Sequence, residues 1–86
     1  MLHILQSAID QTDFEQLLTT VEAGDALVLM DDGVYLLEQL HQAPCPGYVI
    51  QGHRQMRGLM ATQGIVELDM EGLVTLTAQH TSSASW

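Results

Sequence analysis

The hydrophobic positions of the chain are organised around one uninterrupted apolar stretch, Ala26 to Met30. A strand with one face in water alternates apolar and polar side chains, whereas a strand buried on both faces does not. The acidic loop Asp31-Asp32-Gly33 follows, and from Val34 the apolar positions recur at helical spacing. The pattern predicts a buried central strand over Asp25 to Met30, then a short helix over Val34 to Leu40 capped by one of the two acids. In open α/β sheets, sites lie at such carboxyl ends of strands.

The residues before this strand predict a first strand and an amphipathic helix. Met1 to Leu5 is a short, mostly apolar stretch that suits a strand. Thr12 and Glu15 have the spacing of a capping box at the start of a helix. The apolar side chains that follow recur at i, i+3, i+4 and i+7, the spacing of one helix face: Phe14, Leu17, Leu18 and Val21. Gly24 is then expected to end the helix in a left-handed cap.

The second half of the chain predicts two more strands and two more helices after the rigid turn Pro44 to Gly47. In order, these are a strand Tyr48 to Ile50, a short helix that opens at Gly52-His53 and carries Met56, Leu59 and Met60, an edge strand Ile65 to Leu68, and a helix Met70 to Ala78 capped by Asp69. The tail, Gln79 to Trp86, is polar and Ser-rich. Alternating strands and helices with short loops predict an α/β fold, with a small parallel sheet of about four strands flanked by helices, in a single domain over residues 1–86.

Composition adds an expectation of partner subunits. Of the 86 residues, 47 % are hydrophobic and only 15 % are charged, and Arg54 and Arg57 are the only strong bases. A chain of this size has a marginal core and needs a charged shell to stay soluble alone, so part of its surface is expected to be covered by other subunits. The net charge of −9 argues against autonomous binding to nucleic acid or to acidic membranes.

The location expected for this chain is the reducing cytosol. A single cysteine leaves no possibility of an internal disulfide. The first residues lack the basic segment and long apolar segment of a signal peptide, and the longest apolar run is far below the ~20 residues that span a bilayer.

The only thiol in the chain, Cys45, stands between the end of a helix and the start of a strand. The negative end of the helix dipole disfavours a thiolate there, and the position is at the amino end of the sheet, opposite the usual site face. His41, four residues away, is its one possible activator. A turn cysteine without chemistry is the favoured interpretation, and a thiol nucleophile is the alternative.

Metal and cofactor sites find little support in the residue pattern. Asp31, Asp32 and Asp69 could together bind a divalent cation. A related hypothesis is a stand-alone binding module that uses the acidic loop at Asp31-Asp32 for a metal or a small cation. Each Asp stands just before a predicted helix, however, where capping explains it. The four histidines lack zinc spacing, and no glycine-rich phosphate loop is present. We expect no metal and no cofactor, and we expect His3 to be a hydrogen-bonded core or interface residue.

A tryptophan at the very end of a chain, Trp86, is unusual. Terminal residues usually fray, and an exposed indole is costly. We therefore expect this side chain either to be disordered or to pack into a partner or a neighbouring groove.

Motifs in a fixed order give the chain a family resemblance. They cover nearly its whole length: Met1-Leu2-His3, Glu22-Ala-Gly24-Asp25, Asp32-Gly33-Val34, Tyr48-Val49, Arg57-Gly58-Leu59, Leu68-Asp69, Leu76-Thr77, His80 and Trp86. In these motifs the chain resembles the TusB/DsrH family of sulfur-relay subunits.

The resemblance implies a DsrE-like three-layer α/β/α fold and a place in a heterohexamer beside TusC-like and TusD-like subunits. In the TusB branch, the complex passes persulfide sulfur from TusA-like to TusE-like carriers, toward 2-thiolation of tRNA wobble uridine. The sulfur-carrying cysteine belongs to the TusD-like subunit, so this chain would be a non-catalytic structural subunit. In the alternative DsrH branch, the complex serves sulfur oxidation.

The sequence departs from the family pattern in three places. Members of the DsrH type carry a cysteine on the first helix, where this chain has Leu17, so the chain looks like the TusB branch. Cys45 matches no family cysteine, and a stand-alone persulfide carrier that uses Cys45 is an alternative to the structural subunit. The segment between Val34 and Pro44 is several residues shorter than in the family. Motif position makes five residues the interface candidates: Asp32, Gly33, Val34, Arg57 and Trp86.

Overall fold

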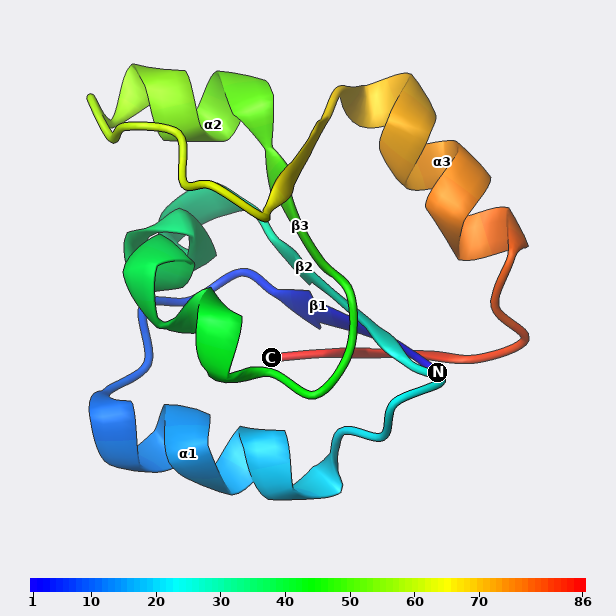
Figure 1. The fold of residues 1–86 in the computed structure, drawn as a ribbon. Coiled ribbons are helices and arrows are strands. Elements are labelled where there is room, and N and C mark those ends of the chain that lie inside the picture. Colours follow the sequence, from blue (N-terminus) through cyan, green and yellow to red (C-terminus); the bar gives the residue numbers. More distant parts are fainter.

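One parallel sheet organises the computed structural model, which describes all 86 residues, Met1 to Trp86 (Figure 1). In chain order the elements are β1 (Leu2–Leu5), α1 (Gln11–Thr20), β2 (Ala26–Leu29), the 3₁₀ helix η1 (Asp31–Gln42), β3 (Gly47–Ile50), α2 (Gln51–Met56), β4 (Val66–Leu68), α3 (Met70–Ala78) and β5 (Ser83–Ser85). The strand order is β4-β3-β2-β1-β5, with all neighbours parallel. None of the helices combines the length and apolar character needed to cross a membrane.

The central strand predicted from the uninterrupted apolar stretch is confirmed. All four residues of β2 are buried, and β2 lies between β1 and β3. The α/β class with its parallel sheet is confirmed as well, and β4 is an edge strand as expected.

The polar tail adds a fifth strand, β5, outside β1, to the about four strands that the sequence predicted. Its Ser-Ala-Ser sequence carries no hydrophobic signal. Backbone bonds at its two ends hold it in place, from Leu2 N–H to the Ser82 carbonyl (3.0 Å) and from Trp86 N–H to the Ile4 carbonyl (2.8 Å). Non-local backbone pairing of this kind leaves no trace in side-chain hydropathy.

Helices cover both faces of the sheet, which gives the three layers α/β/α (Figure 1). Successive residues of each strand point to opposite faces. One face packs against α1 and η1 in a core cluster of 11 buried residues, which includes Leu27, Leu29 and Phe14. The other face packs against α3 in a cluster of six, which includes Val28 and Leu73.

The ends predicted for the first helix need correction. Asp10 caps α1, because its carboxylate accepts a hydrogen bond from Asp13 N–H at 2.8 Å. The predicted capping box is therefore wrong, and Glu15 instead accepts a hydrogen bond from the Gln11 side chain. Gly24 is not left-handed, and the backbone leaves the helix at Val21 in an extended conformation. The predicted apolar stripe faces the core, with only Leu18 partly exposed.

The helix after the central strand is longer and more tightly wound than predicted. It runs from Asp31 to Gln42 as a 3₁₀ helix, and neither acid caps it. A 3₁₀ helix has three residues per turn, and the buried side chains recur at that spacing: Val34, Leu37 and Leu40. This spacing keeps the row of side chains packed against the sheet along the helix.

Of the last two helices, α2 ends earlier than predicted and α3 begins at the predicted cap. The helix α2 ends at Met56, so Leu59 and Met60 lie in the segment that follows it. The cap predicted for α3 is confirmed, because the Asp69 carboxylate accepts a hydrogen bond from Gly72 N–H at 2.7 Å.

At Gly33, η1 approaches the end of β1 too closely for a side chain. A Cβ added at this residue would lie 2.1 Å from the carbonyl oxygen of Leu5. The substitution Gly33→Ala is therefore expected to lower the free energy of unfolding by about 3 kcal/mol, because η1 or β1 must move. Urea unfolding followed by circular dichroism measures the difference.

Gly24→Ala is the matched control, since a Cβ at Gly24 meets no atom within 4 Å. It should change the free energy of unfolding by less than about 1 kcal/mol. Equal effects of the two substitutions would contradict the proposed role of the contact between Gly33 and Leu5.

Candidate functional site

A charged corner lies where β2 and β3 end. Asp31 and Asp32 follow β2, and His53 and Arg57 lie in α2 and at its end. The Arg57 guanidinium donates to one Asp32 carboxylate oxygen from Nε at 3.1 Å and from Nη2 at 3.0 Å. It also donates from Nη1 to the His53 carbonyl at 3.2 Å. Two of the predicted interface residues, Asp32 and Arg57, thus form one ion pair.

The backbone turn at Asp31 is fixed by His53. Asp31 has a φ of 49°, in the left-handed region that Asp tolerates better than most residues. Its N–H donates to Nδ1 of His53 at 2.8 Å. An accepting Nδ1 places the proton of the neutral ring on Nε2.

The other two predicted residues of this corner lie inside the protein. Gly33 is buried against β1, and Val34 is fully buried in the larger core cluster. Asp32, by contrast, has 64 % of its side chain exposed. Gly33 and Val34 therefore position this corner, and Asp32 and Arg57 form its surface.

Two of the three acids considered for a cation site have other partners. Asp69 caps α3 and Asp32 pairs with Arg57. No group of three or more His, Cys, Asp or Glu side chains comes together in a way that could hold a metal ion.

A second polar network lies at the amino ends of β1 and β2. Asp25 accepts a hydrogen bond from the N-terminal ammonium of Met1 at 2.9 Å and from Glu22 N–H at 3.0 Å. Its carboxylate also lies 3.0 Å from Nε2 of His3, which is only 2 % exposed. The Glu22 N–H bond, followed by the ammonium and His3, holds the pKa of Asp25 well below its usual range.

The expectation that His3 is a hydrogen-bonded core residue is confirmed, whereas its partner Asp25 was missed. The parallel register places Leu2 opposite Ala26, so the residues that precede them, Met1 and Asp25, also lie opposite each other. Asp25 could therefore have been found from the sequence only by predicting that β1 and β2 pair in this register.

The terminal tryptophan is ordered and packs against its own chain. Trp86 N–H donates to the Ile4 carbonyl at 2.8 Å, and the Trp86 carbonyl accepts from Gln6 N–H at 2.9 Å. The indole stacks on His3, with ring centroids 6.3 Å apart and planes inclined by 23°. The expected alternative of a disordered Trp86 is therefore wrong, and the indole packs on His3 beside a groove of its own chain.

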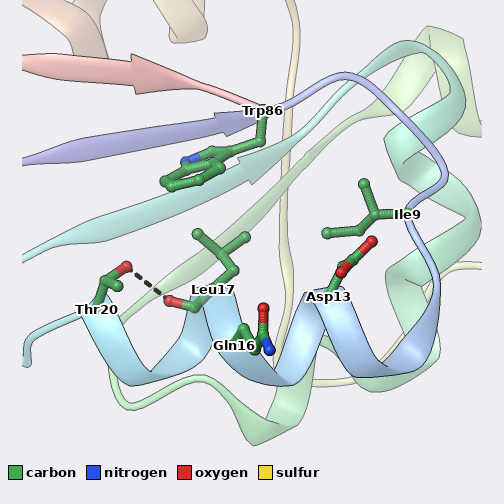
Figure 2. Close-up of a pocket in the computed structure, with 6 residues that line it drawn as sticks. All are labelled: Ile9, Asp13, Gln16, Leu17, Thr20 and Trp86. Carbon is green, nitrogen blue, oxygen red and sulfur yellow. Dashed lines mark hydrogen bonds between the residues drawn. The ribbon is translucent and has the colours of Figure 1, made fainter.

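This groove lies between the tail and the first helix (Figure 2). Its volume is about 430 Å³, and six residues line it: Ile9, Asp13, Gln16, Leu17, Thr20 and Trp86. The indole faces Leu17 across the groove, and 44 % of Trp86 remains exposed.

Cys45 lies in the turn before β3, packed against the larger core cluster. Burial, followed by the negative charge of Asp25, raises the pKa of its thiol. The proposed activator is engaged elsewhere, because Nδ1 of His41 donates to the Glu38 carbonyl at 2.6 Å. These surroundings favour the protonated thiol, and only the thiolate is a nucleophile.

The fold and these sites define a small α/β protein with polar networks at opposite ends of the central strands of a parallel sheet. An indole-lined groove lies beside its first helix. The family model for DsrH like protein matches residues 6–83. The chain therefore belongs to the DsrH-like family, which confirms the resemblance to the TusB/DsrH family of sulfur-relay subunits.

Proteins that this chain is similar to cover its full length. It is 36 % identical to Protein TusB of Escherichia fergusonii and 33 % identical to Protein TusB of Salmonella enteritidis, with each chain covered completely. The solution NMR structure of protein Tm0979 from Thermotoga maritima has a similar fold, with a TM-score of 0.69 and 17 % identity over 93 % of this chain and 94 % of that one.

The polar network around Asp25 should make the stability of the protein depend on pH. Because folding lowers the pKa of this carboxyl below its usual value of 3.8, its contribution to stability is complete above that value and is lost as the pH falls below it. Asp25→Asn is expected to lower stability at pH 7 and to make stability fall less steeply between about pH 4 and pH 2. Urea unfolding at a series of pH values measures both effects.

The control for this substitution is Glu38→Gln, which removes one charge from an exposed side chain that makes no hydrogen bond. It should preserve the acid sensitivity of the natural protein. An Asp25→Asn protein that remains as acid-sensitive as the Glu38→Gln protein would contradict the assignment.

Proposed function

We propose that this chain is a non-catalytic structural subunit of a TusBCD-like sulfur-relay complex that passes persulfide sulfur for 2-thiolation of tRNA wobble uridine. The observation that carries the proposal is its full-length similarity to TusB proteins. The partners would be TusC-like and TusD-like subunits in a heterohexamer in the cytoplasm, with an indirect link to TusA-like and TusE-like carriers. Residues 1–86 would act as one DsrEFH-like domain without a cofactor.

The surroundings of Cys45 support a structural rather than a sulfur-carrying role. A persulfide carrier needs an accessible thiol that ionises readily, which electropositive surroundings favour. Cys45 is partly buried, and the charge of Asp25 further disfavours its thiolate.

The surface of the chain supports assembly with other subunits. Eight large hydrophobic side chains are at least 44 % exposed: Met1, Tyr35, Met56, Met60, Val66, Met70, Val74 and Trp86. Tyr35 and Met60 line the same hollow between η1 and the segment after α2, and Met70 and Val74 lie one turn apart on α3. Grouped apolar side chains of this kind are typical of surfaces that bind other proteins.

The alternative, a DsrH-like subunit of a sulfur-oxidation complex, is less well supported. The resemblance assigns members of that type a cysteine at the position of Leu17. In this chain the position holds a side chain that is 3 % exposed and belongs to the core cluster below α1.

Assembly is the first test of the proposal. Native mass spectrometry of the chain co-expressed with TusC-like and TusD-like subunits from the same genome should show a heterohexamer that contains two copies of each. Its apolar surface and marginal core predict that the chain is poorly soluble when expressed alone. A well-folded monomer that does not bind these subunits would contradict the proposal.

The role of Cys45 has a separate test. A strain whose only copy of this chain carries Cys45→Ser is expected to keep its tRNA 2-thiouridine, measured by mass spectrometry of nucleosides. In the control strain, serine replaces the sulfur-carrying cysteine of the TusD-like subunit, and 2-thiouridine should disappear. Loss of 2-thiouridine in the Cys45→Ser strain, with assembly intact, would instead make this chain a persulfide carrier.

A further inference from the structure

We propose that the groove between Trp86 and α1 receives a cationic side chain, lysine or arginine, from a neighbouring subunit. The proposal rests on the proposed function, since it supplies the chemistry of one contact within that assembly. The groove is open and unoccupied by any side chain of this chain, and its volume of about 430 Å³ accommodates a long side chain.

The lining of the groove combines apolar walls with one free carboxylate. Leu17, Ile9 and the indole of Trp86 supply the walls, and the Asp13 side chain rises from α1 beside Ile9 (Figure 2). The Thr20 hydroxyl already donates to the Leu17 carbonyl at 2.8 Å. The Asp13 carboxylate makes no hydrogen bond or ion pair within the chain, because only its backbone N–H is engaged, with Asp10.

No cation of this chain is available to neutralise Asp13. The chain has no lysine and a net charge of −9. Both arginines lie in and next to α2, where Arg54 pairs with Glu67 and Arg57 with Asp32. The helix α1 carries acidic residues and no basic one. Charge complementarity therefore favours a positively charged group from outside.

Lysine and arginine match both features of this lining. Each has an apolar stem that packs along hydrophobic walls and a positive head that seeks a carboxylate. A cation near an indole face gains a further electrostatic attraction.

The position of the indole is set before any partner binds. Hydrogen bonds on both sides of its backbone and the stack on His3 hold Trp86 in place. Preorganisation lowers the entropy cost of binding, so this wall of the groove is ready to receive a side chain.

The single tryptophan allows a direct test. This chain, labelled with 5-fluorotryptophan, gives one ¹⁹F resonance, which reports on the groove alone when the partner subunits are unlabelled. Adding the TusC-like and TusD-like subunits should shift this resonance as the complex forms. The substitution Asp13→Asn should weaken association about tenfold and reduce its dependence on salt, because a charge pair is lost.

The matched control is Glu15→Gln, which removes an equal charge from the same helix outside the groove. It should associate like the natural protein. If Asp13→Asn also associates like the natural protein while the resonance still shifts, the groove holds a neutral segment and the proposal is overturned. An unshifted resonance in a complete complex would overturn it too.

A second measurement separates this proposal from the proposed function. The labelled chain is titrated with the peptide Ala-Ala-Lys-Ala-Ala and with its counterpart that carries norleucine in place of lysine. The lysine peptide should shift the resonance at lower concentration, and Asp13→Asn should abolish the difference. If the subunits fail to assemble but the lysine peptide binds, the proposed function fails and the cation-binding groove stands. Equal binding of the two peptides would refute the groove's preference for a cation.

Discussion

The structure depends on the close packing of η1 against the end of β1. At Gly33 the space for a Cβ is filled by the Leu5 carbonyl, which also accepts a hydrogen bond from Met30 N–H at 3.0 Å. Only glycine lets the backbone pass this point without displacing a bond of the sheet. This contact fixes how close η1 lies to the sheet. As a result, the row of side chains that begins at Val34 is buried, and Asp32 lies within hydrogen-bond distance of the Arg57 guanidinium.

The polar networks at the two ends of the sheet have a common effect on the charge of the surface. Both join residues more than 20 positions apart in the sequence, Met1 and His3 with Asp25 and Asp32 with Arg57. The chain has only two strong bases, and these networks pair one of them, Arg57, and the N-terminal ammonium with carboxylates. The exposed acids of α1 are therefore left without a positively charged partner in the chain, and a basic neighbour would be drawn to that side of the molecule.

The sequence predicted those features that nearby residues determine. The buried strand β2, the apolar stripe of α1 and the Asp69 cap each depend on spacing within a few residues, and each is confirmed. The fifth strand and the cap at Asp10 were missed. A strand that pairs only through its backbone has no apolar pattern, and several adjacent residues here could cap a helix equally well. The candidate sites were predicted least well, because Asp25 and the Trp86 groove depend on strand register.

The position of Leu17 connects the family comparison with the groove. The resemblance places a cysteine of DsrH-type members on this helix position, whereas here Leu17 is a wall of the groove below Trp86. A thiol at this buried position, on the same groove lining as the Asp13 carboxylate, would ionise poorly, because burial and nearby negative charge raise the pKa of a thiol. These surroundings agree with the proposed role of the groove as a contact surface and do not favour sulfur transfer there. Under the proposed function, such a subunit would contribute to the relay by positioning its partners, and the sulfur would be carried by another subunit.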